Sequence, residues 1–363
     1  MFESYKNVLK RGGSHLMTSL RAIIFAVLTG IVLGFVGTAF YYGMQTVTAM
    51  RLDHPWLILF LPLAGVLIVW LYHLLHDEKD TGTNLVLSAI HSNENIPLRM
   101  APLIFIATLL THLFGGSAGR EGAALQLGGS IGNSLGKLFH FDEKDQHIMI
   151  MCGMSAAFSA LFGTPLAAAV FSMEVVSVGI MHYSALVPCV IASLTAHGIA
   201  SACGIAPEIF PIASIPAFTA KNALIIGIFA VLCALVSILF CTTLHNAERL
   251  YKRFFKNPYV RALAGGLIVI GLTMLVGNQT YNGTGMNIIT GCMEGKTVFP
   301  LAFLLKMVFT AATLGAGYKG GEIVPSFCIG AAFGACFAGL FGMPVTLMAA
   351  CGMVGVFCGV TNC

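Results

Sequence analysis

The chain has 363 residues, of which 57% are hydrophobic and 9% charged, and its formal net charge is +4. Together with a mean hydropathy of +0.87, this composition excludes an ordinary soluble globular domain, because too few charged side chains are available for a water-exposed surface. The positive charge is small and dispersed, which excludes the extended basic surface of a nucleic-acid-binding protein. The sequence predicts an all-α, polytopic membrane protein with no nucleic-acid partner.

Residues 1–21 precede the first apolar segment and are predicted to form a cytoplasmic N-terminal segment. They contain a single acidic residue, Glu3, and four basic residues, Lys6, Lys10, Arg11 and Arg21. Basic residues beside an apolar segment favour the cytoplasmic side of a membrane. The apolar run that follows lacks a small-residue cleavage site, so we expect this segment to remain on the protein.

Apolar segments of roughly the length that crosses a bilayer as a helix recur from residue 22 onward. They cover residues 22–46, 55–76, 101–114, 145–163, 165–204, 221–245, 260–277 and 300–360. Clusters of Gly and Pro interrupt them at residues 115–116, 163–165, 315–321 and 342–344. Non-helical backbone at membrane depth is stable only against protein or water, so these interruptions indicate a substrate path.

Two parts of the chain resemble each other in the order of their small residues. The shared pattern is Gly-x-x-x-Gly followed by Cys-Gly-Met, at Gly128, Gly132 and Cys152 in the first half and at Gly330, Gly334 and Cys351 in the second. Either match alone indicates only close helix packing. Because both occur in the same order and at nearly the same separation, they indicate an internal duplication, an architecture in which half-helix N-termini meet at a substrate site.

The stretch 115–129 places charged residues among glycines just before an apolar helix. Glycines let the backbone open so that several N–H groups point at one spot, and a helix N-terminus adds positive partial charge. Such a turn can hold a bare anion without a full cation. Its candidate anion contacts are Gly119, Arg120 and Gly122.

Glu121 lies in the same turn and is the first residue to which we assign a task. A carboxylate at membrane depth is costly unless it is paired or functional. Glu121 can occupy an anion site itself and swing out when protonated; the alternatives are a structural ion pair with Arg120 or a cap on its own helix. Glu174, in the apolar run 167–178, is either a second intramembrane carboxylate or a residue that reaches the interface.

A second glycine turn, residues 315–325, mirrors the first and leads into another apolar helix with Pro325 near its start. Its backbone can face the same ion from the other repeat, through the candidate contacts Gly321, Glu322, Ile323 and Val324. The Glu322 side chain may alternatively be assigned to capping the helix or to pairing with Lys319. A third candidate is the polar pair Thr83 and Asn84, which either donate hydrogen bonds to a desolvated anion or form an ordinary N-cap.

These motifs resemble the CLC family of chloride channels and proton-coupled anion exchangers, over nearly the whole chain from about residue 20. Gly119-Arg120-Glu121-Gly122 resembles the family's G-[KR]-E-G-P motif, with Ala123 at the usual Pro, which implies that Glu121 is the gating glutamate. The segment 320–325 resembles the G-x-F-x-P turn, with Ile323 at the aromatic position. The segment 164–167 resembles N-A-P-L-A.

Several departures from the family pattern affect the expected ion and proton route. Val175 stands at the position of the inner proton-transfer glutamate, and Thr83 and Asn84 lie where the family has the serine of G-S-G-I-P. Together with the Gly-Gly-Glu-x-x-Pro form of the second turn, these differences look like the fluoride-exporting branch, although Val324 stands at that branch's threonine. The C-terminal helix with the pore tyrosine has no counterpart before Cys363.

The resemblance implies a homodimer in a bacterial cytoplasmic membrane, with one pathway per subunit and two inverted repeats of broken and tilted helices. We expect the repeats at residues 22–205 and 221–363, joined by a linker at 206–220, with the second repeat incomplete. The predicted function is transport of chloride or fluoride as a proton-coupled exchanger. The alternatives are a passive chloride channel and a truncated fragment that transports nothing.

Other functional classes fit less well. The eleven cysteines lie mostly in apolar runs and form no C-x-x-C pair, so we expect no metal and no cofactor. A cation carrier is disfavoured by helix N-termini that point inward. The segment 115–119 also fits the G-x-S-x-G pattern of a serine hydrolase, with Ser117 and His112, but its flanks are predicted to be helical, whereas a hydrolase elbow follows a strand. We therefore predict that the protein is not an enzyme.

Overall fold

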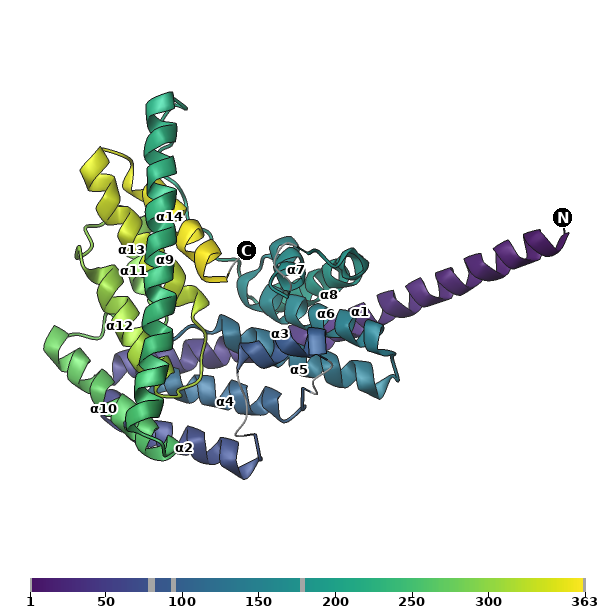
Figure 1. The fold of residues 1–363 in the computed structure, drawn as a ribbon, viewed down its shortest axis with the longest axis horizontal. Coiled ribbons are helices and arrows are strands. Elements are labelled where there is room, and N and C mark those ends of the chain that lie inside the picture. Colours follow the sequence, from purple (N-terminus) through teal and green to yellow (C-terminus); the bar gives the residue numbers. More distant parts are fainter. Residues whose placement is uncertain (1, 78–81, 93–95, 177–179, 362–363) are drawn as a thin grey trace. The chain divides into compact units, whose positions relative to one another are not determined.

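The computed structural model describes residues 2–361 apart from 78–81, 93–95 and 177–179, and this part of the chain is mainly helical (Figure 1). The first helices are α1 (Phe2–Asp53), α2 (Leu61–Leu74), α3 (Thr83–Ser92), α4 (Met100–Leu113), α5 (Glu121–Leu138), α6 (Glu143–Phe162) and α7 (Pro165–Glu174). They are followed by α8 (Tyr183–Ala202), α9 (Ala220–Phe254), α10 (Pro258–Val276), α11 (Met286–Met293), α12 (Ala302–Gly315), α13 (Ile323–Phe341) and α14 (Val345–Thr361). A short 3-10 helix, η1 (Pro55–Phe60), precedes α2. The described residues contain no strand, which confirms the all-α prediction.

Each predicted cluster of Gly and Pro lies at a helix break. The long apolar segment 300–360 divides into α12, α13 and α14 at residues 315–321 and 342–344, and α6 gives way to α7 at residues 163–165. The segment 165–204 also divides, into α7 and α8, between Glu174 and Tyr183, where no cluster was predicted. Thr164 is the N-cap of α7 and Pro165 is its first residue. Pro is favoured there because its missing N–H has no intrahelical partner at that position. The predicted interruptions are therefore confirmed.

The chain divides into two compact units that alternate along the sequence. One comprises Met1–Tyr41, Asn84–Ala101 and Ala124–Pro207, and the other comprises Tyr42–Thr83, Pro102–Ala123 and Glu208–Cys363. In the first unit, α6, α7 and α8 pack on one another. In the second, the long helix α9 runs beside α12, α13 and α14, and α10 packs against α2 (Figure 1). These compact units are not sequence repeats, so the expected repeat boundaries stay a prediction.

The duplicated glycines make the same kind of contact in each unit. A Cβ added at Gly128 of α5 would meet the carbonyl oxygen of Gly153 in α6. A Cβ added at Gly330 of α13 would likewise meet the carbonyl oxygen of Gly352 in α14. In both cases the missing side chain lets two helix backbones approach closely, as is common between membrane helices. The pattern recognised in the sequence therefore corresponds to equivalent helix crossings.

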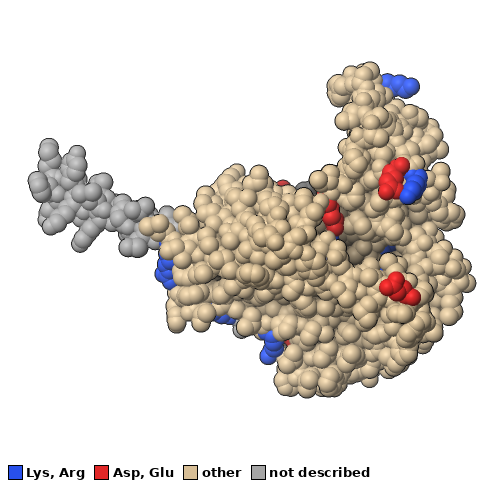
Figure 2. Space-filling view, turned by 180° about the vertical axis from the view of Figure 1, so that it is seen from behind, with Lys and Arg blue, Asp and Glu red and all other residues tan. Residues whose placement is uncertain are grey.

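The surface is that of a membrane protein. In the described part of the chain, six helical segments are long and apolar enough to span a membrane: Leu20–Asp53, Pro55–Leu74, Tyr183–Ala202, Ala220–Phe254, Pro258–Val276 and Ile323–Phe341. Large apolar side chains such as Leu63, Leu224 and Leu275 are exposed along them. Charged side chains are scattered over the face drawn in Figure 2, most of which is uncharged. Exposed apolar surface of this extent indicates contact with lipid.

Candidate anion site

The two glycine turns predicted from the sequence meet in the second compact unit. The Gly119 N–H donates to the Gly321 carbonyl at 2.6 Å, and the Gly321 N–H donates back to the Gly119 carbonyl at 2.7 Å. This pair forms an isolated antiparallel bridge. The approach requires glycine, since a Cβ on Gly321 would lie 2.5 Å from the backbone nitrogen of Gly122. The bridge therefore holds the starts of α5 and α13 side by side.

The starts of α5 and α13 present backbone N–H groups near the bridge between Gly119 and Gly321. Glu121 is the first residue of α5 and Ile323 the first of α13. The first N–H groups of a helix have no carbonyl partner within it and carry positive partial charge. In α13 the third residue is Pro325, which has no N–H, and the Ser326 N–H donates to the Glu322 carbonyl at 2.9 Å. The amides of Ile323 and Val324 are thus the two that α13 presents.

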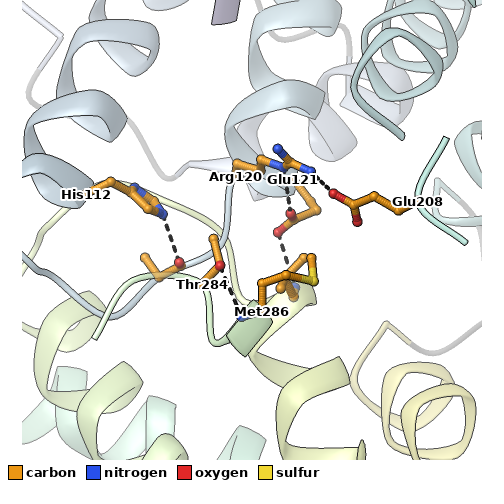
Figure 3. Close-up of polar contacts among 8 residues, drawn as sticks. His112, Arg120, Glu121, Glu208, Thr284 and Met286 are labelled. Carbon is orange, nitrogen blue, oxygen red and sulfur yellow. Dashed lines mark hydrogen bonds and ion pairs between the residues drawn. The ribbon is translucent and has the colours of Figure 1, made fainter. Parts of the chain in front are cut away.

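Glu121 lies between the two helix starts and is fully buried. Its Oε2 accepts a hydrogen bond from the Val324 N–H at 3.2 Å, drawn in Figure 3. Its Oε1 lies 3.9 Å from Nε of Arg120 and has no hydrogen-bond partner among the described residues. A carboxylate from one turn therefore accepts a hydrogen bond from the second residue of the helix that follows the other turn.

Arg120 has its closest ionic contact with a residue that the sequence analysis did not select. Its Nη2 lies 2.5 Å from Oε1 of Glu208, in the loop between α8 and α9. Figure 3 shows the guanidinium between the carboxylates of Glu208 and Glu121. The structural alternative for Glu121, an ion pair with Arg120, is thus present only as the longer of these two contacts. No sequence signal marked Glu208, because it lies in a stretch predicted only as a linker.

The other predicted anion contacts are Thr83, Asn84, Glu322, Gly119 and Gly321, and they differ in how they relate to the Glu121 carboxylate. The Thr83 hydroxyl donates to the Gly122 carbonyl at 3.4 Å, so Thr83 reaches the first turn of α5. Asn84 belongs to α3, but its side chain lies outside the described side chains. Glu322 is the N-cap of α13; it is exposed, and its side chain makes no capping hydrogen bond. The amides of Gly119 and Gly321 are occupied by their mutual bridge.

A buried lysine from α12 forms a hydrogen bond to the first glycine turn. Lys306 of α12 is fully buried, and its ammonium donates to Ser117 Oγ at 2.9 Å, to the Gly283 carbonyl at 2.6 Å and to the Tyr281 carbonyl at 3.2 Å. An ammonium has three donors, so each one has an acceptor. The sequence did carry a signal for this residue, since Lys306 is the only charged residue of the apolar run 302–315.

The serine and histidine of the hydrolase alternative each have other partners. The ring nitrogens of His112 lie 2.9 Å from the Thr108 carbonyl and 3.0 Å from the Ala118 carbonyl. Ser117 contacts Lys306 and Thr310 and is fully buried. Nucleophilic catalysis needs a base hydrogen-bonded to an accessible serine. This arrangement does not match it.

The remaining sequence candidates lie at the end of α7. Glu174 is the last residue of that helix and Val175 its C-cap, and both are partly buried. Val178, the end of the apolar run that contains Glu174, lies outside the described residues, as does Cys363.

Comparisons with known proteins agree on the family. The family model for the voltage gated chloride channel matches residues 64–363. A chloride/fluoride channel protein of Pseudomonas syringae pv. tomato is 35% identical over 347 residues, which is 94% of this chain and 76% of that protein. An H(+)/Cl(-) exchange transporter, ClcA of Vibrio cholerae, is 26% identical over 92% of this chain and 75% of its own length.

Solved structures show the same fold. The crystal structure of a CLC-type fluoride/proton antiporter has 36% sequence identity and a TM-score of 0.91, covering 94% of this chain and 87% of that one. A slow cyanobacterial Cl-/H+ antiporter, at 18% identity and a TM-score of 0.78, shares the fold. The resemblance to the family is therefore confirmed, and the chain belongs to the CLC family of voltage gated chloride channels.

Proposed function

We propose that this chain exchanges a halide for protons across the membrane, with fluoride as the first ion to test and chloride as the second. The carboxylate of Glu121 and the anion occupy the site at the start of α13 alternately. Family membership supports transport as such. The structure with 36% identity belongs to a fluoride/proton antiporter, which favours fluoride and proton coupling.

The observation that carries the proposal is the hydrogen bond from the Val324 N–H to Glu121 Oε2. A negatively charged group already lies where a helix N-terminus favours an anion. When Glu121 takes up a proton, it loses the charge that this helix start stabilises. It can then leave, and a halide can bind the same amides. The proton stays on the carboxylate while the anion moves, and this alternation couples the two.

The predicted contacts divide into two roles in this proposal. The groups that contact the anion are the amides of Gly122, Glu322, Ile323 and Val324 with the polar groups of Thr83 and Asn84. Gly119 and Gly321 instead hold the two helix starts together, because each amide already has an acceptor. Arg120 supplies positive charge beside the proposed anion site. The contact from Val324 is made by its backbone, so it does not depend on the threonine expected at that position.

A passive channel is the second candidate, and Val175 favours it. An apolar side chain at the position of the inner glutamate cannot carry a proton onward from Glu121. The two candidates differ in their response to a proton gradient: an exchanger moves halide against its gradient when protons flow the other way, and a channel does not.

The oligomeric state, the membrane and the repeat boundaries are also proposed. The protein works as a homodimer with one pathway per subunit in a bacterial cytoplasmic membrane. Each subunit has inverted repeats at residues 22–205 and 221–363 after the cytoplasmic segment 1–21. Two sequence motifs in the same order and the meeting of their helix starts support the repeats.

The experiment measures fluoride and chloride flux in liposomes that contain the purified protein, with and without a proton uncoupler. Glu121→Gln is the test variant. Glu294→Gln is the matched control, since Glu294 is an exposed glutamate that pairs with Lys296 outside the site. We expect proton-dependent fluoride flux in the wild type and the control, and loss of proton coupling in Glu121→Gln.

Three other outcomes separate the alternatives. Halide flux that ignores the proton gradient in the wild type indicates a channel. Unchanged coupling in Glu121→Gln removes Glu121 from the mechanism. Folded protein in the membrane that moves neither ion contradicts the proposed transport.

A further inference from the structure

Glu208 makes the shortest ionic contact at the site although it lies in a loop. Its side chain is 32% exposed, while the Arg120 side chain that it meets is 10% exposed. The two atoms are 2.5 Å apart, within the reach of a charge-assisted hydrogen bond. The loop between α8 and α9 is thereby fixed to the residue that immediately precedes Glu121.

Among the described contacts of Arg120, two involve carboxylates, and the one to Glu208 is the closer. The contact to Glu208 is a hydrogen-bonded ion pair, whereas the 3.9 Å separation from Glu121 is too long for a hydrogen bond. Glu121 Oε1 is left without a hydrogen-bond partner among the described residues. The guanidinium is therefore held back from the carboxylate beside it.

A full ion pair between Arg120 and Glu121 would oppose the proposed exchange. Both side chains are buried, and a buried carboxylate that is paired and hydrogen-bonded to arginine strongly favours its charged form. Such a carboxylate would neither take up a proton readily nor leave the helix start. Keeping Arg120 at a distance preserves the positive potential near the anion without trapping Glu121.

We propose that Glu208 is a positioning residue that holds Arg120 away from Glu121 and so keeps Glu121 able to bind and release its proton. The inference rests on the proposed function for its consequence on transport. Arg120 and Glu208 lie beside Glu121, and the buried ammonium of Lys306 in α12 also interacts electrostatically with it. Lys306 does not contact Glu208 in the described residues, so a change of charge at Glu208 acts on Glu121 directly and through Arg120. Both effects have the same sign, because removing a neighbouring negative charge and bringing a guanidinium closer each stabilise charged Glu121.

The test follows the protonation of Glu121 itself by difference infrared spectroscopy as the pH is varied. The band of the protonated carboxylic acid is assigned by its loss in Glu121→Gln. In Glu208→Gln we expect the pH at which half of Glu121 is protonated to move to the acid side by on the order of one unit. Glu208→Asp keeps the charge but lengthens the ion pair, so it should give a smaller shift in the same direction. Glu294→Gln should leave the band unchanged.

Transport gives a second readout. Glu208→Gln should move the pH profile of proton-coupled flux to the acid side, and it should have no further effect when combined with Glu121→Gln. A variant that only loosens the loop would instead lower stability by the same amount in both backgrounds and leave the pH profile in place. That result overturns the proposal, as does an unshifted infrared band in Glu208→Gln.

Failure of this inference and failure of the proposed function give different results. If the wild type carries no flux, the proposed function is wrong, and the infrared titration still decides whether Glu208 controls Glu121. If Glu208→Gln does not fold, Glu208→Asp decides, because its shorter side chain lengthens the ion pair and should shift the band part of the way. A folded Asp variant with no shift overturns the proposal.

Discussion

Lys306 contacts two loops of the second unit at once. Its ammonium contacts Ser117, in the turn before Glu121, and the carbonyl groups of Tyr281 and Gly283. A buried ammonium is costly unless its donors are satisfied, and here all three have acceptors. We infer that this residue fixes the shape of the turn that carries Glu121.

Replacing Lys306 by Met should therefore destabilise the protein. Two backbone carbonyl groups lose their donor, while the cost of burying the charge is removed, so we expect a net loss of about 2 kcal/mol. The measurement is the melting temperature of the detergent-solubilised protein. Lys296→Met is the matched control, because Lys296 is 71% exposed and its ion pair with Glu294 contributes little. Equal melting temperatures for the two variants would show that Lys306 has no such structural role.

The site could be predicted residue by residue only where the sequence itself carries the reason. Glu121 is identifiable because it is an acid between glycines at membrane depth. Glu208 is not, since its importance comes from a contact between a loop and a turn 88 residues away. Gly119 and Gly321 were predicted as anion contacts, but spacing alone could not reveal that their amides bond to each other.

Among the elements, α12 presents one polar face to the first glycine turn. Lys306, Thr310 and Thr313 recur at helical spacing and are fully buried, and each contacts Ser117: Thr310 through its hydroxyl, Thr313 by accepting from the Ser117 N–H at 3.0 Å. This spacing is visible in the sequence. A polar stripe on an otherwise apolar helix indicates that the stripe faces protein rather than lipid.

The crossing of α13 and α14 depends on glycine at Gly334, where a Cβ would meet the carbonyl oxygen of Met348. Gly334→Ala should push the helices apart and destabilise the protein by roughly 1–3 kcal/mol. Gly339→Ala is the control on the same helix, since nothing lies within 4 Å of the added Cβ. Alanine is also the better helix former, so the control should melt at the same or a higher temperature. If Gly334→Ala melts like the control, the crossing does not require glycine.

Some of the element boundaries were predictable because clusters of Gly and Pro mark them. The division of 300–360 into α12, α13 and α14 follows from clusters that break helices in any context. The bridge between residues 119 and 321 was not predictable in the same way, because two segments far apart in the chain meet there through backbone atoms. The duplicated pattern and the second glycine turn predicted that the two helix starts face the same ion, but not that their backbones bond to each other.

At the scale of the whole molecule, the length of α1 bears on how the chain enters the membrane. The helix has 52 residues, which is about 78 Å at 1.5 Å per residue, and the hydrocarbon core is only about 30 Å thick. Its apolar span begins at Leu20. The residues before Leu20 therefore extend beyond the bilayer, and their basic excess favours the cytoplasmic side.

We expect a protease-cleavable tag on the N-terminus to be protected in spheroplasts and cleaved in inverted membrane vesicles. Replacing Lys6, Lys10 and Arg11 by Gln is the matched comparison. It removes most of the positive charge and should give a mixed population in which part of the tag becomes accessible from outside. Cleavage of the tag on the unmodified chain in intact spheroplasts would instead show that the N-terminus lies on the outer side of the membrane.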